Sequence, residues 1–220
     1  MAKETEQHRA QRARAILAKL KKTRPKARLE LNFSSPLELL VATVLAAQAL
    51  DRTVNEVTKT LFRHCRTAYD YANADLKKLE EEIKATGFYH QKAKALVAIG
   101  KQLVEKHGAQ VPGTMEELTG LHGVARKTAN VVLGAAMGIP AGIVVDRHVA
   151  RVSQRTGLSA EKTPEKIEAE LMALLPQKDW IAFGTHYTLH GRYICTARRP
   201  KCSTCPLLDL CPQIGVTDAQ

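Results

Sequence analysis

The chain has 220 residues, 45% of them hydrophobic, which suffices for one substantial core or for two small cores that share an interface. Its 33 Lys and Arg residues outnumber 22 Asp and Glu residues, and the formal net charge of +11 is typical of a protein that neutralises phosphates, although membrane surfaces and acidic proteins also fit. The charged N-terminus and an apolar stretch (131–145) broken by glycine and proline exclude a secretory signal and a membrane span, so we expect an intracellular protein with this stretch in its core.

The positive charge is unevenly distributed. Residues 1–29 carry ten basic side chains against two acidic ones, and residues 192–201 contain no acid. No acid lies among four further lysines, Lys84, Lys92, Lys94 and Lys101. These groups predict DNA binding through the phosphate backbone that weakens steeply with salt, the alternative being a solvated surface.

Helix start and stop signals recur along the chain, and no segment alternates apolar and polar residues for long, which predicts an all-α fold. The first signal is a capping box with proline at the first helical position, Ser35-Pro36-Leu37-Glu38. Later signals predict helices from an Asp51 cap to His64, from an Asp75 cap to Gly87, over 90–107 before Gly108, over 115–120, and from Thr163-Pro164 to about Pro176.

Four of the five cysteines form a motif with the spacing Cys195-x6-Cys202-x2-Cys205-x5-Cys211. Disulfides are disfavoured because nothing predicts secretion and intracellular thiols stay reduced. Zinc sites usually pair two C-x2-C knuckles, and this run has one. Four thiolates at uneven spacing in one loop favour a [4Fe–4S] cluster. The fifth cysteine, Cys65, is predicted to be a buried thiol on an apolar helix.

The segment 121–130, LHGVARKTAN, lies between two predicted helices and is typical of a helix–hairpin–helix. The turn would aim backbone N–H groups at a DNA phosphate, and an ordinary helix–turn–helix corner is the alternative. Lys127 falls in the first turn of the second helix, where the helix dipole should lower its pKa and make the amine nucleophilic. The other interpretation is a phosphate-binding lysine.

Asp146 follows the apolar run 143–145 and precedes a helix, so its default interpretation is an N-cap. Together with Lys127, nineteen residues earlier, it becomes a carboxylate that could face the amine across a cleft.

With these motifs the sequence closely resembles the endonuclease III branch of the helix–hairpin–helix DNA glycosylases, nearly end to end. Besides the cysteine spacing, the matching segments are Leu31–Pro36, Ala47-Gln48-Ala49 with Asp51, Gly87-Phe88-Tyr89, Lys127–Asn130, Val145-Asp146 and Leu189–Tyr193. The sequence departs from the family pattern at His122, where Pro is usual, at Ala125, where Gly is usual, and at Ala46 and Leu50 beside Gln48.

The resemblance implies a six-helix barrel domain (29–140) and a discontinuous helical domain (1–28 and 141–220) that carries the cluster, with a DNA groove between them. It implies that Lys127 is the nucleophile and Asp146 its acidic partner. Gln48 and Phe88 would fill or wedge the gap left by the extruded base, and the hairpin, His122, Gly123, Val124, Ala125 and Arg126, would bind the DNA backbone. The expected protein is a cytoplasmic, nucleoid-associated bacterial monomer that acts on damaged double-stranded DNA, with no membrane partner.

The implied reaction is removal of oxidised or ring-saturated pyrimidines, followed by strand cleavage 3′ to the abasic site by β-elimination. Three other classes remain open. An adenine glycosylase of the same superfamily lacks the lysine, a non-catalytic DNA-binding module needs no Lys127–Asp146 pair, and an electron-transfer protein needs no helix–hairpin–helix.

Overall fold

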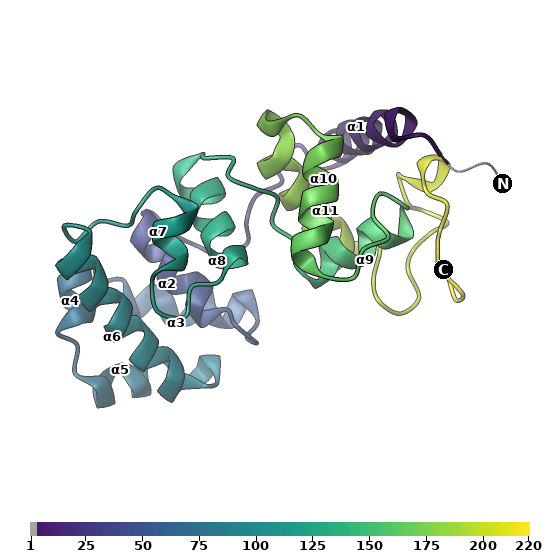
Figure 1. The fold of residues 1–220 in the computed structure, drawn as a ribbon. Coiled ribbons are helices and arrows are strands. Elements are labelled where there is room, and N and C mark those ends of the chain that lie inside the picture. The colour runs from purple at the N-terminus through teal and green to yellow at the C-terminus, as the bar shows by residue number, and fades with distance from the viewer. Residues whose placement is uncertain (1–3) are drawn as a thin grey trace. The chain divides into compact units, whose positions relative to one another are not determined.

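In the computed structural model, which describes residues 4–220, every regular element is a helix (Figure 1). The all-α prediction is therefore confirmed for this part of the chain. None of the helices in residues 4–220 is long and apolar enough to cross a membrane.

The chain forms two compact units. One is continuous and consists of Leu29–Ala141. The other combines the two ends of the chain, Met1–Arg28 and Gly142–Gln220, and is described from residue 4 onward.

The continuous unit is organised around the long helix α6, which packs on α2, α4 and α5. Its helices are α2 (Pro36–Leu45), α3 (Asp51–Leu61), α4 (Ala68–Ala72), α5 (Leu76–Ile83), the 3₁₀ turn η1 (Lys84–Thr86), α6 (Tyr89–Lys106), α7 (Met115–Thr119), α8 (Arg126–Val131) and the π-helical turn η2 (Val132–Ala136). Gly100 allows α4 and α6 to approach closely, because a Cβ at this position would lie 2.5 Å from the backbone nitrogen of Ala72. Any larger residue at position 100 would force the two helices apart.

The discontinuous unit has its own apolar core, to which α1, α9, α10 and α11 contribute. Its helices are α1 (Glu6–Thr23), α9 (Arg147–Arg155), α10 (Pro164–Leu174), η3 (Gln177–Asp179), α11 (Trp180–Tyr193) and η4 (Leu208–Leu210). Helix α1 buries Ala13, Ile16, Leu17 and Leu20, so the basic N-terminal segment is a structural helix with one apolar face.

Several predicted helix boundaries are confirmed. Asp75 caps α5 by accepting from the backbone N–H of Lys78, and η1 ends at Gly87 in the left-handed region (φ 69°). Helix α6 ends at Lys106, next to His107 and the left-handed Gly108. These ends were predictable because each depends on residues within one turn of it.

Two capping predictions were wrong in part. Ser35 accepts from the backbone N–H of Glu38 as expected, but the Glu38 carboxylate bonds to the N–H and hydroxyl of Ser34 and not to Ser35. Asp51 is not the N-cap of α3, because that position is taken by Leu50. Asp51 is the first helical residue, where its negative charge is attracted to the positive end of the helix dipole. Helix α3 also ends at Leu61, and residues 62–64 form a turn instead.

Two core predictions also need correction. Cys65 is buried, and burial raises the pKa of its thiol to about 11, but it follows the turn after α3 and is not on a helix. The apolar stretch 131–145 is core only near its ends, because Val131–Leu133 belong to one unit and Ile143 and Val145 to the other. Its middle connects the two units and is partly exposed, with Ala135, Gly138 and Ile139 open to solvent.

Candidate functional site

The predicted hairpin joins α7 to α8 within the continuous unit. Leu121 and Val124 are buried, and the backbone N–H of Val124 donates to the carbonyl of Leu121 across the turn. Between them Gly123 adopts a left-handed conformation (φ 71°), which glycine accepts without steric cost. The buried pair anchors the turn and leaves His122 and Gly123 exposed.

The side chain of Gln102, on α6, binds the backbone of this hairpin. The Gln102 amide accepts the backbone N–H of His122 at 2.7 Å and donates to the carbonyl of Gly120 at 3.2 Å. A proline at position 122, the residue usual in the family that this chain resembles, has no N–H for this bond. Because His122 has a backbone N–H, the hairpin gains a hydrogen bond to α6 that proline would not make.

Lys127 is exposed in the first turn of α8, as the sequence predicted. The N-cap of α8 is Ala125, which makes no side-chain capping bond. Its backbone is extended (φ −83°, ψ 164°), a conformation open to any residue, so alanine replaces the usual glycine there without strain.

Gln48 and Phe88, predicted to enter the DNA, lie in two tight turns of the same unit. Gln48 (φ 55°) follows α2, and Phe88 (φ 50°) is the N-cap of α6. Left-handed backbone is uncommon for residues other than glycine, and both side chains are exposed, Phe88 by 58%. Strained backbone at exposed side chains suits residues that are held out toward a ligand.

Of the four lysines predicted to bind phosphates, Lys92 does not fit. Its side chain is buried at 5% exposure, and its ammonium donates to the carbonyls of Leu45 at 2.7 Å and Thr86 at 2.8 Å. Burial lowers the pKa of Lys92. Lys94 and Lys101 are exposed, and Lys84 pairs with Glu81 on the surface.

Asp146 belongs to the discontinuous unit and is the N-cap of α9. One carboxylate oxygen, Oδ1, accepts the backbone N–H groups of His148 and Val149, each at 2.8 Å. The capping interpretation is therefore confirmed. Lys127 belongs to the other unit, so the pairing of these two residues stays a prediction.

The four C-terminal cysteines line one shared pocket. Other lining residues include Arg155, His190, Ile194 and Leu207. Four sulfurs from one loop converging on a shared cavity are the donor set that an iron–sulfur cluster requires, so these residues fit the group. Within residues 4–220 no three His, Cys, Asp or Glu side chains are grouped to hold a single metal ion.

Two arginines one helical turn apart on α9 bind the start of this loop. Arg151 donates to the carbonyls of Gly191 and Cys195, and Arg155 donates to the carbonyls of Thr196 and Ala197 and to the sulfur of Cys195 at 3.4 Å. Sequence reasoning missed both residues. Their i, i+4 spacing on a helix before the cysteine motif was the available signal.

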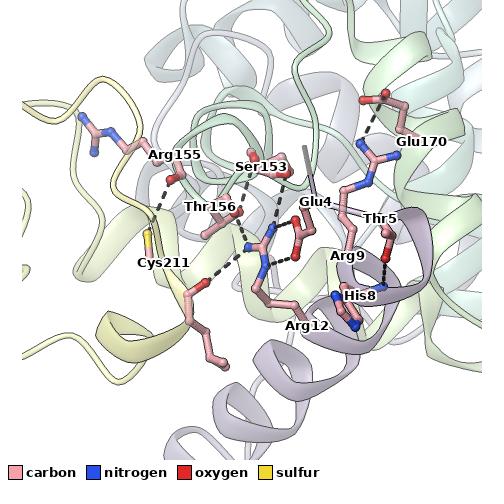
Figure 2. A network of polar contacts seen from close by, with 12 residues as sticks. Glu4, Thr5, His8, Arg9, Arg12, Ser153, Arg155, Thr156, Glu170 and Cys211 are labelled. Carbon is pink, nitrogen blue, oxygen red and sulfur yellow. Dashed lines mark hydrogen bonds and ion pairs between the residues drawn. The ribbon is translucent and has the colours of Figure 1, made fainter. Parts of the chain in front are cut away.

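Arg12 of α1 binds the other end of the loop (Figure 2). Its guanidinium pairs with Glu4 and donates to the carbonyls of Thr156 and Leu210. The hydrogen bond to Glu4 raises the pKa of Arg12. The sulfur of Cys211 lies 3.5 Å from the carbonyl oxygen of Arg155, so the N-terminal helix, the end of α9 and the last cysteine lie close together in one network.

A histidine beside the pocket is kept neutral by burial, which lowers the pKa of His190 to about 4. The His190 ring lies 3.7 Å from the sulfur of Cys205. A neutral imidazole at this position adds no charge to the cysteine pocket.

Two family models match the chain. The HhH-GPD superfamily of base excision DNA repair proteins matches residues 41–177, which include the hairpin, Lys127 and Asp146. The iron–sulfur binding domain of endonuclease III matches residues 195–211, the interval from the first to the last cysteine of the motif.

Known proteins match over nearly the whole length. The endonuclease III of Synechocystis sp. is 49% identical over 92% of both chains, and that of Escherichia coli is 40% identical over 89% of this chain and 92% of its own. A solved structure of a trapped endonuclease III–DNA covalent intermediate superposes with a TM-score of 0.88 at 41% identity, covering 93% of this chain and 96% of that one. A thermostable thymine-DNA glycosylase, 19% identical, shares the fold with a TM-score of 0.84.

The chain therefore belongs to the HhH-GPD superfamily of base excision DNA repair proteins and, within it, to the endonuclease III family. It is a DNA glycosylase and abasic-site lyase that binds DNA. It carries a [4Fe–4S] cluster.

The Gln102 contacts generate a testable prediction. Replacing Gln102 with Leu removes two hydrogen bonds to the hairpin backbone, which should lower the free energy of unfolding by about 1–3 kcal/mol and weaken binding to undamaged duplex. Gln110→Leu, an exposed glutamine of the same unit, is the matched control. Urea unfolding measures the stability and fluorescence anisotropy measures DNA binding. A Gln102 variant that behaves like the control would show that these two hydrogen bonds contribute little to either.

Proposed function

We propose that this protein removes oxidised or ring-saturated pyrimidines from double-stranded DNA and then cleaves the strand on the 3′ side of the abasic site. In this scheme the uncharged amine of Lys127 attacks the sugar C1′, the glycosidic bond breaks, and the base leaves with the bonding electron pair and takes up a proton. The sugar opens to a Schiff base on Lys127. Loss of a C2′ proton then expels the 3′ phosphate by β-elimination.

The observation that carries this proposal is the exposed lysine at the start of α8, directly after a hairpin whose backbone is hydrogen-bonded to Gln102. A hairpin that binds a phosphate of the damaged strand would place this amine beside the sugar, which is the positioning that covalent catalysis needs. The solved structure at 41% identity, a covalent endonuclease III–DNA intermediate, supports the same chemistry here.

Asp146 would deprotonate the lysine or stabilise the positive charge that develops on the sugar. Its Oδ1 is engaged with the two backbone N–H groups of α9, which fixes the orientation of the carboxylate. In this proposal both units bind the damaged duplex, and Lys127 and Asp146 act on the same nucleotide.

The remaining contacts follow from the exposed turns. Gln48 and Phe88 would occupy the gap left by the extruded base, and the hairpin from His122 to Arg126 would bind the backbone. Extrusion requires unstacking, which a damaged base resists less than an intact one. We also propose that the protein acts as a monomer at the bacterial nucleoid, with damaged duplex as its partner.

Cys195, Cys202, Cys205 and Cys211 are proposed as the ligands of the cluster. A cluster bound by four thiolates cross-links a loop that is also held by arginine-to-carbonyl bonds and by the buried side chain of Leu207. The role proposed for the cluster is structural.

The test of the nucleophile is borohydride trapping. Wild-type protein should form a covalent adduct with DNA that contains a lesion or an abasic site, because reduction makes the Schiff base permanent. Lys127→Ala should abolish trapping and strand cleavage but still bind an abasic-site analogue, since phosphate contacts elsewhere dominate affinity. Lys77→Ala, an exposed lysine on α5 outside the predicted DNA-binding groups, is the control and should trap normally. Continued trapping by Lys127→Ala would identify another amine as the nucleophile.

The two functions of Asp146 can be separated by two variants. Asn can keep the capping bonds to α9 but removes the charge, so Asp146→Asn should slow base release by on the order of 10²-fold while leaving the unfolding midpoint nearly unchanged. Asp146→Ala should show the same kinetic loss and in addition lower the free energy of unfolding by about 1 kcal/mol. Full activity of the Asn variant in single-turnover assays would assign Asp146 a capping role alone.

The cluster assignment predicts a yellow-brown protein with a broad absorption near roughly 400 nm. Cys202→Ser should lose most of this absorption and reduce soluble yield, whereas Cys65→Ser, outside the pocket, should keep the absorption. Iron and sulfide analysis of both variants provides the measurement. An undiminished cluster content in Cys202→Ser would remove this residue from the ligand set.

A further inference from the structure

The buried ammonium of Lys92 joins two parts of the chain that are far apart in sequence. Leu45, whose carbonyl accepts at 2.7 Å, is the last residue of α2, and Thr86, whose carbonyl accepts at 2.8 Å, is the last residue of η1. Carbonyls at the end of a helix lack partners within that helix and carry the negative end of its dipole. A cation with two such acceptors is compensated for part of the cost of its burial.

Each bonded carbonyl directly precedes one of the two exposed left-handed turns. Gln48 (φ 55°) lies three residues after Leu45, and Phe88 (φ 50°) lies two residues after Thr86. The backbone N–H of Lys92 also donates to the carbonyl of Phe88, as an ordinary hydrogen bond of the first turn of α6. The Lys92 ammonium itself therefore contacts the backbone shortly before each of the two turns.

We infer that Lys92 is a positioning residue that sets the separation of the Gln48 and Phe88 turns, so that both side chains can enter the DNA together when the base is extruded. The inference rests on the roles proposed above for Gln48 and Phe88. Lys92 is buried and acts through these two turns, without touching DNA itself.

This position predicts a selective effect on catalysis. Loss of the shared cation should loosen both turns and thereby slow the step that opens the duplex. The hairpin is held by Gln102 and not by Lys92, so phosphate binding and the chemistry of Lys127 should be largely retained. If Lys92 were only structural, its replacement would instead slow all steps of the reaction and lower the free energy of unfolding as well.

The first measurement is amide hydrogen exchange, which does not depend on the enzymatic reaction. Lys92→Met keeps the length and apolar stem of the side chain but has no donor, and it should speed exchange in residues 46–49 and in residues 87–89. Lys94→Met, on the exposed side of the same helix, is the matched control and should leave both segments as in wild type. Unchanged exchange in either segment of Lys92→Met would overturn the inference.

The second measurement compares substrates in single turnover. For a duplex with one 5,6-dihydrothymine opposite adenine, Lys92→Met should release the base on the order of 10- to 100-fold more slowly than wild type, the loss expected for misplaced contact groups. Cleavage and trapping at a preformed abasic site, where no base has to be extruded, should change little. Equal slowing on both substrates would show a general structural role and contradict the inference.

Two more variants address the mechanism of the effect. Gln48→Ala should slow base release less in the Lys92→Met background than in wild type, because both changes disable the same turn, whereas additive effects would contradict a shared pathway. If Lys92→Met does not fold, Lys92→Gln is measured in its place with the same expected pattern. The proposed function is tested separately by borohydride trapping. If Lys127→Ala still traps DNA, the proposed nucleophile is wrong, whereas the hydrogen-exchange result for Lys92→Met does not depend on that outcome.

Discussion

Hydrogen bonds from partly or fully buried cations to carbonyls at helix ends support the functional segments of both units. Short helices leave many such carbonyls without partners inside the helix. In the continuous unit Lys92 binds the carbonyls that end α2 and η1. In the discontinuous unit Arg151, Arg155 and Arg12 bind carbonyls at the end of α11, along the cysteine loop and after α9. These bonds hold segments that follow the ends of helices, where the backbone carbonyls have no partners within the helix.

This use of cations changes the meaning of the net charge of +11. The excess of basic residues suggested a surface for phosphates, yet Lys92 and Arg12 are occupied inside the fold. Lys19 and Lys21 of α1 pair with Asp209 and Asp179. Part of the positive charge therefore stabilises the protein, and a smaller set of exposed cations is available to DNA.

Features that depend on residues close together in the sequence could be predicted, whereas features that depend on residues far apart in the sequence could not. The Asp75 and Asp146 caps, the stop at Gly108 and the hairpin at Gly123 depend on neighbours within a turn, and the structure confirms them. The burial of Lys92 depends on a carbonyl 47 residues away. A signal was nevertheless present, because Lys92, Leu96, Ile99 and Leu103 share the i, i+4, i+7, i+11 pattern of one buried helix face.

The effects of the departures from the family pattern could not be predicted from the sequence, because they depend on the folded backbone. Ala125 raised the question of whether its backbone requires glycine, and its extended conformation shows that it does not. His122 provides the N–H that Gln102 accepts, a contact that only the folded position of α6 reveals. The choice of lesion depends on a flipped base and on contacts to DNA, which local sequence patterns do not encode.

The amine that forms the covalent bond to DNA can be located directly. Protein trapped with borohydride on a duplex carrying an abasic site is digested, and the peptide that bears the sugar remnant is sequenced by tandem mass spectrometry. We expect the modification on the side-chain amine of Lys127 alone. A modification on another lysine or on the N-terminal amine, with Lys127 unmodified, would contradict it.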